Sequence, residues 1–383
     1  MPLAFDPAWL GEELAMYRDT VDRFVATEMQ PADEADRKRG HVGHALWRRA
    51  GELGLLCSDI PEAYGGGGGD FRHAAVFYDA MARRALTGMN SSVHAIVAHY
   101  LLNHGTESQK ERFLPRLARG ELVGAIAMTE PDTGSDLQGV RTRAERSGGH
   151  YYVIQGAKTF ISNGFLAGLV LVVCKTDPSR RARGTSILIV ETAEARGYRV
   201  GRMLDKIGLK AQDTSELFFD GVEVPEENLL GGEEGRGFAQ LMHDLPYERT
   251  IIGVLGLAAM EGAYQATLDY VRQRTAFGQP IAAFQNTKFK LAEIATTLKV
   301  ARAFVDRCVS DLVAGTLDTA TASMVKLWIS EQQGRLIDEC VQLHGGYGFM
   351  NEYLVGRMYV DARIQRIYGG TSEIMKEVIS RSL

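Results

Sequence analysis

The chain has 383 residues, 45% of them apolar, and a prior of about 150 residues per domain predicts two or three domains. Its 43 basic and 48 acidic residues give a net charge of -5, which offers no broad cationic surface to a nucleic-acid backbone. A nucleic-acid partner is therefore not expected. The four cysteines exclude a disulfide framework, and none has the spacing of a structural zinc site, so we expect no metal. The longest uninterrupted apolar run, 251–260, is about half of a ~20-residue membrane span, so we expect a cytoplasmic protein without a membrane segment.

The hydrophobic pattern divides the chain into three parts. Residues 1–120 repeat apolar side chains every three or four positions, which predicts helices. Residues 121–236 contain short β-rich runs bounded by turn residues, whereas residues 237–383 return to the helical period. The runs expected as strands are 151–154, 169–173, 186–190 and 216–219. We predict an α+β fold without the strand-helix alternation of a doubly wound parallel sheet.

Two patterns in the first part suggest a ligand but favour a structural explanation. The five glycines at 65–69 lack the lysine and hydroxyl residue of a phosphate-binding loop, so we expect a loose surface loop between helices. His94, His99 and His104 are five residues apart, which turns successive rings about 140° from one another on a helix. This spacing argues against a shared metal site.

Two segments of the middle part can present groups to a flat ring. Residues 128–136 combine Pro, Gly and short polar side chains, which predicts a turn that directs hydroxyls and backbone N–H groups toward one point. In residues 158–164, Phe160 and Ser162 are two positions apart and share a face if the segment is a strand. Each segment alone is also explained as an ordinary turn or strand.

Glu248 is the candidate catalytic residue on which we place most weight. On a helix it lies between Asp244 and Ile252, and a like charge and apolar surroundings both raise the pKa of a carboxyl. A raised pKa is what a general base working near neutral pH needs. The alternative is a structural ion pair with Arg249 or another cation, which residue type alone favours.

Three segments of the last part combine glycines with polar or cationic side chains. In 272–285, Arg274 precedes a loop and suits either a solvated helix end or a dinucleotide phosphate. Residues 342–346 end a helix with two glycines, for which a plain C-cap is the simpler explanation. Residues 368–373 open a helix with Thr371 as the expected N-cap, so unpaired amides lie beside two glycines where a substrate oxygen can approach.

Taken in order, these segments resemble the acyl-CoA dehydrogenase family over essentially the whole chain. The resemblance implies an N-terminal helical domain over 1–120, a middle β domain over 121–236 and a C-terminal four-helix domain over 237–383. It also implies that FAD binds between the β domain and the C-terminal domain. The implied assembly is a homotetramer, a dimer of dimers, in which a neighbouring subunit completes the FAD site.

The resemblance assigns the cofactor and substrate contacts residue by residue. At the flavin and substrate cleft it implies Ile126, Met128, Thr129, Gly134 and Ser135, with Phe160 and Ser162 on the other side of the flavin. For the pyrophosphate and adenosine it implies contacts from Arg274, Phe277 and Gln285. Across the subunit boundary it implies FAD contacts from Gln342, Gly345 and Gly346, and from the last helix it implies contacts from Thr371 and Glu373. The implied substrate contacts are Ser135, Arg249, Gly369 and Gly370. Phe160 replaces the tryptophan common in the family and keeps an aromatic face.

The position of the catalytic base separates two subgroups of this family. Many members carry the base directly after the tyrosine that matches Tyr368, and here that position is Gly369. A second subgroup, the long-chain and isovaleryl types, carries it on an earlier helix at the position of Glu248. The residues around both positions resemble the long-chain type, which implies an active enzyme.

The implied reaction is the FAD-dependent α,β-dehydrogenation of an acyl-CoA to a 2-enoyl-CoA, as in fatty-acid β-oxidation. Glu248 would remove the α-proton while the β-hydrogen leaves as hydride to the flavin. A ribityl hydroxyl of FAD and the N–H of Gly369 would polarise the thioester carbonyl. Electrons would then pass to an electron-transfer flavoprotein.

Three alternatives stay open. A related flavin monooxygenase does not need an α-proton base, so the presence of Glu248 weighs against it. A dehydrogenase acting on an acyl-carrier protein in a biosynthetic cluster is not excluded. A non-catalytic helical scaffold is disfavoured because the base and the flavin-contact positions all carry suitable residues.

Overall fold

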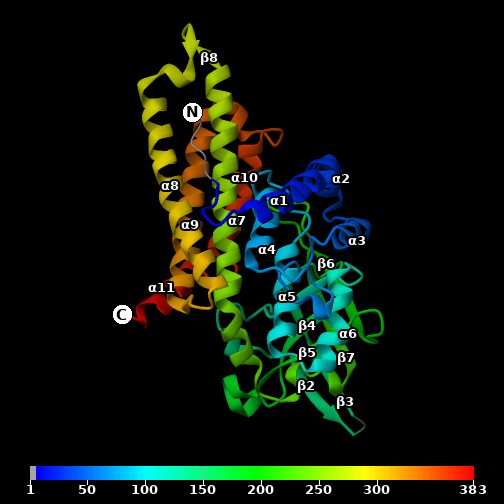
Figure 1. Ribbon diagram of the computed structural model, residues 1–383. Coiled ribbons are helices and arrows are strands. Elements are labelled where there is room, and N and C mark those ends of the chain that lie inside the picture. The colour runs from blue at the N-terminus through cyan, green and yellow to red at the C-terminus, as the bar shows by residue number, and fades with distance from the viewer. Residues whose placement is uncertain (1–5, 149) are drawn as a thin grey trace.

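The computed structural model describes residues 6–148 and 150–383, and the N-terminal part of this chain is helical (Figure 1). Residues 1–5 of the predicted N-terminal domain lie outside the described residues. The helices are α1 (Glu12–Phe24), α2 (Gln30–Arg39), α3 (His44–Glu52), α4 (Phe71–Ala82), α5 (Ser91–His104) and α6 (Glu107–Ala118). Asp70 and Thr106 begin α4 and α6 as capping boxes, because each side chain accepts from a backbone N–H of the first turn.

The middle part is a seven-stranded sheet. Its strands are β1 (Gly124–Ala127), β2 (Arg143–Ser147), β3 (Tyr151–Ser162), β4 (Leu169–Lys175), β5 (Thr185–Glu191), β6 (Tyr198–Met203) and β7 (Thr214–Pro225). The order is β1-β4-β2-β3-β7-β6, with β5 paired to β4. The β1–β4 pair is parallel and the β3–β7 pair is antiparallel, so the sheet is mixed. All four predicted strand runs lie in strands, and β4 is buried along its whole length, as its unbroken apolar sequence predicts.

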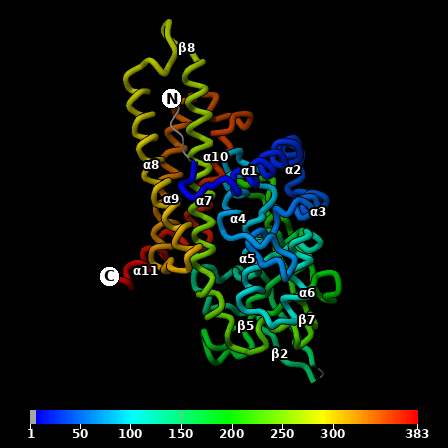
Figure 2. The backbone as a smooth tube through the Cα atoms, viewed as in Figure 1, coloured from blue at the N-terminus to red at the C-terminus, as the bar shows by residue number. Residues whose placement is uncertain are grey.

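The C-terminal part is a bundle of long helices. It contains α7 (Gly237–Gln273), a short hairpin of β8 (Thr275–Ala276) and β9 (Gln279–Pro280), then α8 (Gln285–Val313), α9 (Thr319–His344), α10 (Leu354–Ala362) and α11 (Ser372–Ser380). Helices α7, α8 and α9 run side by side, and the β8 hairpin projects from one end of the bundle (Figures 1 and 2). These three parts confirm the predicted α+β fold of helical, β and helical domains.

Helix α7 is long and apolar enough to cross a membrane by length and composition alone. In its most apolar stretch, 67% of the residues are buried inside the protein. A core helix surrounded by other helices has the same composition.

The N-terminal helices and α7 share one hydrophobic core. Phe77 and Met81 of α4 belong to the same buried cluster as Leu257 and Met260 of α7. The middle part is tied to the C-terminal part by Asp361, whose Oδ1 accepts from the N–H of Leu209 at 2.5 Å. A site at this junction therefore depends on all three parts.

The five glycines at 65–69 form a packed segment. Each of their N–H groups donates to a backbone carbonyl of residues 57–62. A Cβ added to Gly66 would lie 2.2 Å from the carbonyl oxygen of Ile60. The glycines are needed because the backbone folds closely on itself, and the expectation of a loose loop is wrong in this respect.

Candidate active site

A cavity of about 250 Å³ lies where the three parts meet. Its apolar wall comes mainly from α4, α5 and α7, and much of its polar wall comes from the middle part, α9 and the segment 361–369. Of the residues predicted from the sequence, it brings together Ile126, Ser162, Glu248 and Gly369. These four residues come from distant parts of the sequence and line one space, as a binding site requires.

Glu248 lines this cavity from α7, together with Ile252 and Leu255 of the same helix. The hydroxyl of Tyr100 on α5 donates to Oε1 of Glu248 at 3.0 Å. Burial raises the pKa of Glu248 to about 7, the hydrogen bond from Tyr100 opposes this rise, and the charge of Asp244 adds to it. A carboxyl that titrates near neutrality can act as a general base.

Arg249 points to a different side of α7 from Glu248. It is buried and donates from Nη1 to Oγ of Ser323 on α9 at 2.8 Å. Burial lowers the pKa of Arg249, and the charge of Glu248 partly offsets this. Within the described residues Glu248 forms no ion pair with Arg249 or another cation, so the structural alternative for Glu248 is not supported. Arg249 does not line the cavity, and its role in substrate binding stays a prediction.

Gly369 and Gly370 form a turn that needs residues without side chains. Their φ angles are 62° and 89°, and a Cβ added to Gly369 would lie 2.5 Å from Cδ1 of Ile252. Lys326 of α9 is fully buried and donates from Nζ to the carbonyl oxygen of Gly370 at 2.5 Å. The N–H of Gly369 has no acceptor among residues 6–148 and 150–383 and is free to bind a ligand oxygen.

The start of α11 follows this turn. Thr371 accepts from the N–H of Ile374 at 3.3 Å, which confirms it as the N-cap. Glu373 lies in the first turn of the same helix, on the surface. Neither residue lines the cavity in this chain, so their cofactor contacts stay predictions.

The predicted turn of the middle part is anchored to β3 by a buried ion pair. Nζ of Lys158 donates to the carbonyl oxygen of Met128 and to Oε1 of Glu130, both at 2.9 Å. Glu130 also accepts from the N–H groups of Arg141 and Thr142. The predicted residues held in this turn but outside the cavity lining are Met128, Thr129, Gly134 and Ser135.

Phe160 presents an exposed ring on β3. Its side chain is 67% exposed and its φ is 59°, where the pairing of β3 with β7 shifts register. A left-handed backbone is costly for an aromatic residue and is retained where it serves a purpose. Two residues later, Ser162 lines the cavity and accepts from Nε2 of Gln212 at 3.2 Å.

Three oxygens in the cavity wall lack partners. Oε1 of Gln333, Oε1 of Gln365 and Oδ2 of Asp361 are buried and have no hydrogen-bond partner among the described residues. Burial raises the pKa of Asp361 to about 6. Buried polar groups are normally paired, so these three oxygens are exceptions that lie on the polar side of the cavity.

The predicted phosphate and adenosine contacts lie beyond the other end of α7. Arg274 directly follows the helix, and a rise of 1.5 Å per residue puts it about 39 Å from Glu248 along the axis. Its guanidinium lies 5.9 Å from the ring centre of Tyr347, beside the loop after α9. The predicted residues in the loops and helix ends of this region are Arg274, Phe277, Gln285, Gln342, Gly345 and Gly346. None of them lines the cavity of this chain.

Several groups at the site were not predicted. Tyr100 is 148 residues from Glu248 in sequence, so no local pattern connects them. Gln333 and Lys326 are buried polar residues of α9, and their only sequence signal is a polar side chain on an otherwise apolar helix face.

Three family models match the chain. They describe the acyl-CoA dehydrogenase N-terminal domain over residues 11–121, the middle domain over 125–222 and the C-terminal domain over 235–383. The rat protein named long-chain specific acyl-CoA dehydrogenase, mitochondrial, is 47% identical over 376 residues, which cover 97% of this chain and 87% of that protein.

Solved structures agree with these matches. The crystal structure of an acyl-CoA dehydrogenase from Geobacillus kaustophilus superposes with a TM-score of 0.95 at 42% identity, covering 98% of this chain and 99% of the other. A glutaryl-CoA dehydrogenase from Mycobacterium smegmatis, in complex with FADH2, gives a TM-score of 0.90 at 28% identity, covering 97% and 95%. The chain belongs to the acyl-CoA dehydrogenase family of oxidoreductases.

Proposed function

We propose that this protein is an FAD-dependent acyl-CoA dehydrogenase that introduces the α,β double bond into an acyl-CoA thioester, with Glu248 as its base. The observation that carries the proposal is that Glu248 and the free N–H of Gly369 share one cavity. In a thioester the α-carbon is bonded to the carbonyl carbon. A carbonyl oxygen bound at Gly369 therefore keeps the α-proton near the carboxylate.

The residues of the cavity have separate tasks in this reaction. Tyr100 donates to Oε1 of Glu248, which leaves Oε2 to accept the α-proton. The N–H of Gly369 stabilises the negative charge that develops on the carbonyl oxygen as this proton leaves. Bound FAD would supply the acceptor of the β-hydride. The apolar walls of α4 and α7 exclude water from the reacting atoms.

The separation of the two groups of cofactor residues supports a homotetramer, a dimer of dimers. The flavin side of the site is lined by Ser162, Gln333 and Gln365, whereas Arg274 is about 39 Å away along α7. In the proposed assembly, the end of the bundle that carries Arg274 reaches the cofactor of another subunit. A cytoplasmic location and electron transfer to an electron-transfer flavoprotein complete the proposal.

The shape of the cavity supports a medium or long acyl chain. Glu248, Ile252, Leu255 and Ala259 line it along one face of α7, a stretch of about 16 Å. Carbon–carbon bonds of about 1.5 Å advance about 1.25 Å each in an extended chain, so this stretch holds roughly a dozen carbons. Ala82 lines the cavity from the end of α4, and the next residue, Arg83, packs against Gly262, one turn beyond Ala259.

Anaerobic flavin reduction against acyl-CoAs of graded length tests the proposal. We expect bleaching by saturated acyl-CoAs, fastest for chains of about 10 to 14 carbons. Ala259→Phe fills the far end of the cavity and should slow reduction by the long substrates about tenfold while short ones keep their rate, because only long chains reach this position. Failure of every acyl-CoA to bleach the flavin would refute the proposed function. An equal loss of rate in Ala259→Phe for acyl chains of all lengths would refute the proposed position of the acyl chain along α7.

The activity should depend on pH through Glu248. Burial raises its pKa to about 7, so the rate of flavin reduction should rise about tenfold from pH 6 to 8, where the carboxylate form becomes dominant. Stability should change in the opposite sense. The raised pKa of Glu248 stabilises the folded protein fully below pH 4.5, the ordinary pKa of a glutamate, and this stabilisation is lost as the pH rises through about 7. Stopped-flow rates and melting temperatures across this range, with Glu248→Gln as reference, measure both effects.

Arg274→Ala should weaken FAD retention about 10- to 100-fold, because a charge-assisted contact to phosphate is lost. Arg274 is exposed, so the fold of each chain should not change. The measurements are the ratio of flavin to protein absorbance and the molar mass in solution. Arg272→Ala, another exposed cation two residues earlier, is the matched control. Full FAD content and an intact tetramer in Arg274→Ala would remove Arg274 from the cofactor site.

The alternatives predict different reactivity of the same protein. A flavin monooxygenase would use oxygen rapidly once its flavin is reduced, whereas a dehydrogenase would hand its electrons to a protein acceptor. An acyl-carrier enzyme would be reduced faster by acyl-carrier protein than by the matching acyl-CoA. Stopped-flow oxidation and paired substrates separate these outcomes.

A further inference from the structure

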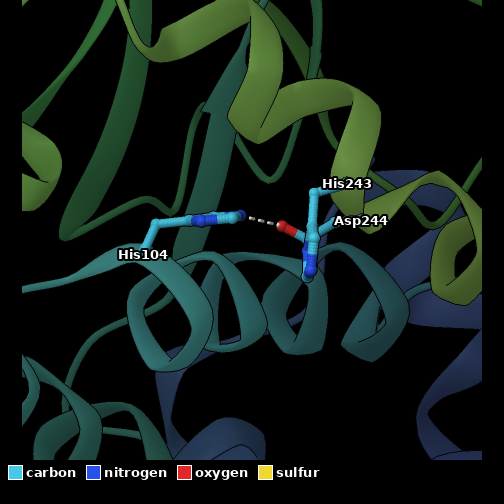
Figure 3. Close-up of side chains that lie close together, drawn as sticks. All are labelled: His104, His243 and Asp244. Atoms are coloured by element: carbon cyan, nitrogen blue, oxygen red, sulfur yellow. Dashed lines mark hydrogen bonds and ion pairs between the residues drawn. The ribbon is translucent and has the colours of Figure 1, made fainter. Parts of the chain in front are cut away.

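Two histidines and a carboxylate meet beside the proposed base (Figure 3). His104 ends α5, whereas His243 and Asp244 lie on α7, and one polar atom from each lies within 4.8 Å of the others. Nε2 of His104 lies 2.7 Å from Oδ2 of Asp244, and because a carboxylate only accepts, the ring N–H donates. Asn103 donates to the other oxygen, Oδ1, at 2.6 Å.

The structure favours a hydrogen-bonded network over a metal centre at this point. Both oxygens of Asp244 already accept hydrogen bonds, and Asp244 is only 3% exposed. His243 and Asp244 are consecutive on a helix, so their side chains leave the axis about 100° apart. The side chain of His243 is 64% exposed and lies 3.4 Å from Oδ1 of Asp244.

The hydrogen bond between His104 and Asp244 joins α5 to α7 in the same way as the hydrogen bond between Tyr100 and Glu248. Tyr100 and His104 are four residues apart on α5, and Asp244 and Glu248 are four residues apart on α7, so each pair shares a helix face. Tyr100 bonds Glu248 at 3.0 Å and His104 bonds Asp244 at 2.7 Å. These two cross-links hold α5 and α7 antiparallel, and they fix the carboxylate of Asp244 one turn from that of Glu248.

The charge of Asp244 acts on Glu248 in a site with few other charges. On α7, Arg249 donates to Ser323 and lies outside the cavity, and its charge opposes that of Asp244 by lowering the pKa of Glu248. Burial is the main cause of the raised pKa of Glu248, and Asp244 adds to it. The other titratable groups on the surrounding elements are Tyr78 of α4, His99 of α5 paired with Asp59, Lys326 of α9, and Asp361 and Tyr368 of the cavity wall.

We propose that Asp244 and His104 are positioning residues that set the pH at which Glu248 becomes a base. The negative charge of Asp244 disfavours ionisation of Glu248, and His104 limits this effect by donating a hydrogen bond to Asp244. The chemistry at the cavity is thereby linked to the imidazole of His104 on α5. This inference rests on the proposed function of Glu248.

Variants of the pair test the inference through the pH profile of flavin reduction. Asp244→Asn keeps the shape of the side chain and removes its charge, so the midpoint of the profile should fall by about one unit and reduction at pH 6 should be roughly fivefold faster. His104→Asn leaves the charge of Asp244 without its imidazole partner, so the midpoint should rise by about half a unit. The double variant should follow Asp244→Asn, because without the carboxylate there is no charge for His104 to offset. His243→Asn is the matched control and should keep the wild-type midpoint.

The two single variants must shift the midpoint in opposite directions. Midpoints that stay at the wild-type value, or that move together, would overturn the inference and leave the pair a structural cross-link. Infrared titration of the protonated Glu248 carboxyl, identified by its loss in Glu248→Gln, gives a readout that does not need turnover. If no acyl-CoA reduces the wild-type flavin, the proposed function fails while this titration still tests the pair. Should Asp244→Asn not fold, the midpoint of His104→Asn alone tests the inference. A rise supports it, and a fall or no change overturns it.

Discussion

Glu248→Gln should retain FAD and lose about a thousandfold or more of the rate of flavin reduction by acyl-CoA. The amide has the shape of the carboxylate and still accepts the hydrogen bond from Tyr100, which lies 3.0 Å from Oε1. It has no basic oxygen for the α-proton. Glu248 forms no ion pair with any described residue, so its replacement breaks no direct ion pair, although it removes the charge that partly offsets the burial of Arg249; the melting temperature should stay close to that of the wild type.

The matched control is Asp269→Asn, which makes the same change in an exposed side chain on α7. Rapid-scan spectra under anaerobic conditions give the rate, and the flavin absorbance of the purified variant gives the cofactor content. Undiminished bleaching in Glu248→Gln would place the base on another residue. Loss of FAD in this variant, with Asp269→Asn intact, would mean that Glu248 has a structural role instead.

Gly369→Ala should lower the rate of flavin reduction about a hundredfold. The φ of Gly369 is 62°, which strains any residue with a side chain, and the added Cβ would lie 2.5 Å from Cδ1 of Ile252, so either the turn shifts away from α7 or the end of the Ile252 side chain moves. Moving its N–H away from the substrate oxygen removes a hydrogen bond that is strongest in the transition state, and such donors contribute about 10² to 10³ in rate. The kcat should fall more than the affinity for acyl-CoA.

Two further variants separate the causes of this effect. Gly315→Ala places alanine at a φ of 69° with no atom within 4 Å, so it reports backbone strain without a clash. That variant should lose about 1 kcal/mol of stability and keep its activity. Shortening the neighbour in the double variant Gly369→Ala/Ile252→Val should restore part of the rate. An unchanged rate in Gly369→Ala would show that this amide does not contact the substrate.

The sequence predicted the fold where hydrophobic patterns are strong. The run at 169–173 is apolar at every position and is the fully buried strand β4. Strands β1, β2 and β6 were not predicted. Only one of the five residues of β2 is buried, so its strand character comes from pairing with β3 and has no alternating pattern. The short β1 has no bulky β-former except Ile126.

Sequence patterns single out candidate residues whose signal is local, and they miss contacts between distant segments. The neighbours of Glu248 along one helix are visible in the sequence, but its role as the base was implied by the family resemblance and stays a prediction. Tyr100, Gln333 and Asp361 reach the cavity only when α5, α9 and α10 pack around it, and no spacing in the sequence encodes that packing. The residues after α7, such as Arg274, stay predictions because their expected partner lies in another subunit.

Ile252 of α7 lies against residue 369, the position at which the family resemblance places the base of other members. Its side chain fills the space that any substituent at residue 369 would enter, with 2.5 Å between the atoms concerned. A carboxylate introduced at residue 369 would either displace the end of the Ile252 side chain or need a smaller residue at 252. An exchange of one arrangement for the other would therefore be eased by a paired change at residue 252, which is far from residue 369 in sequence but touches it in space.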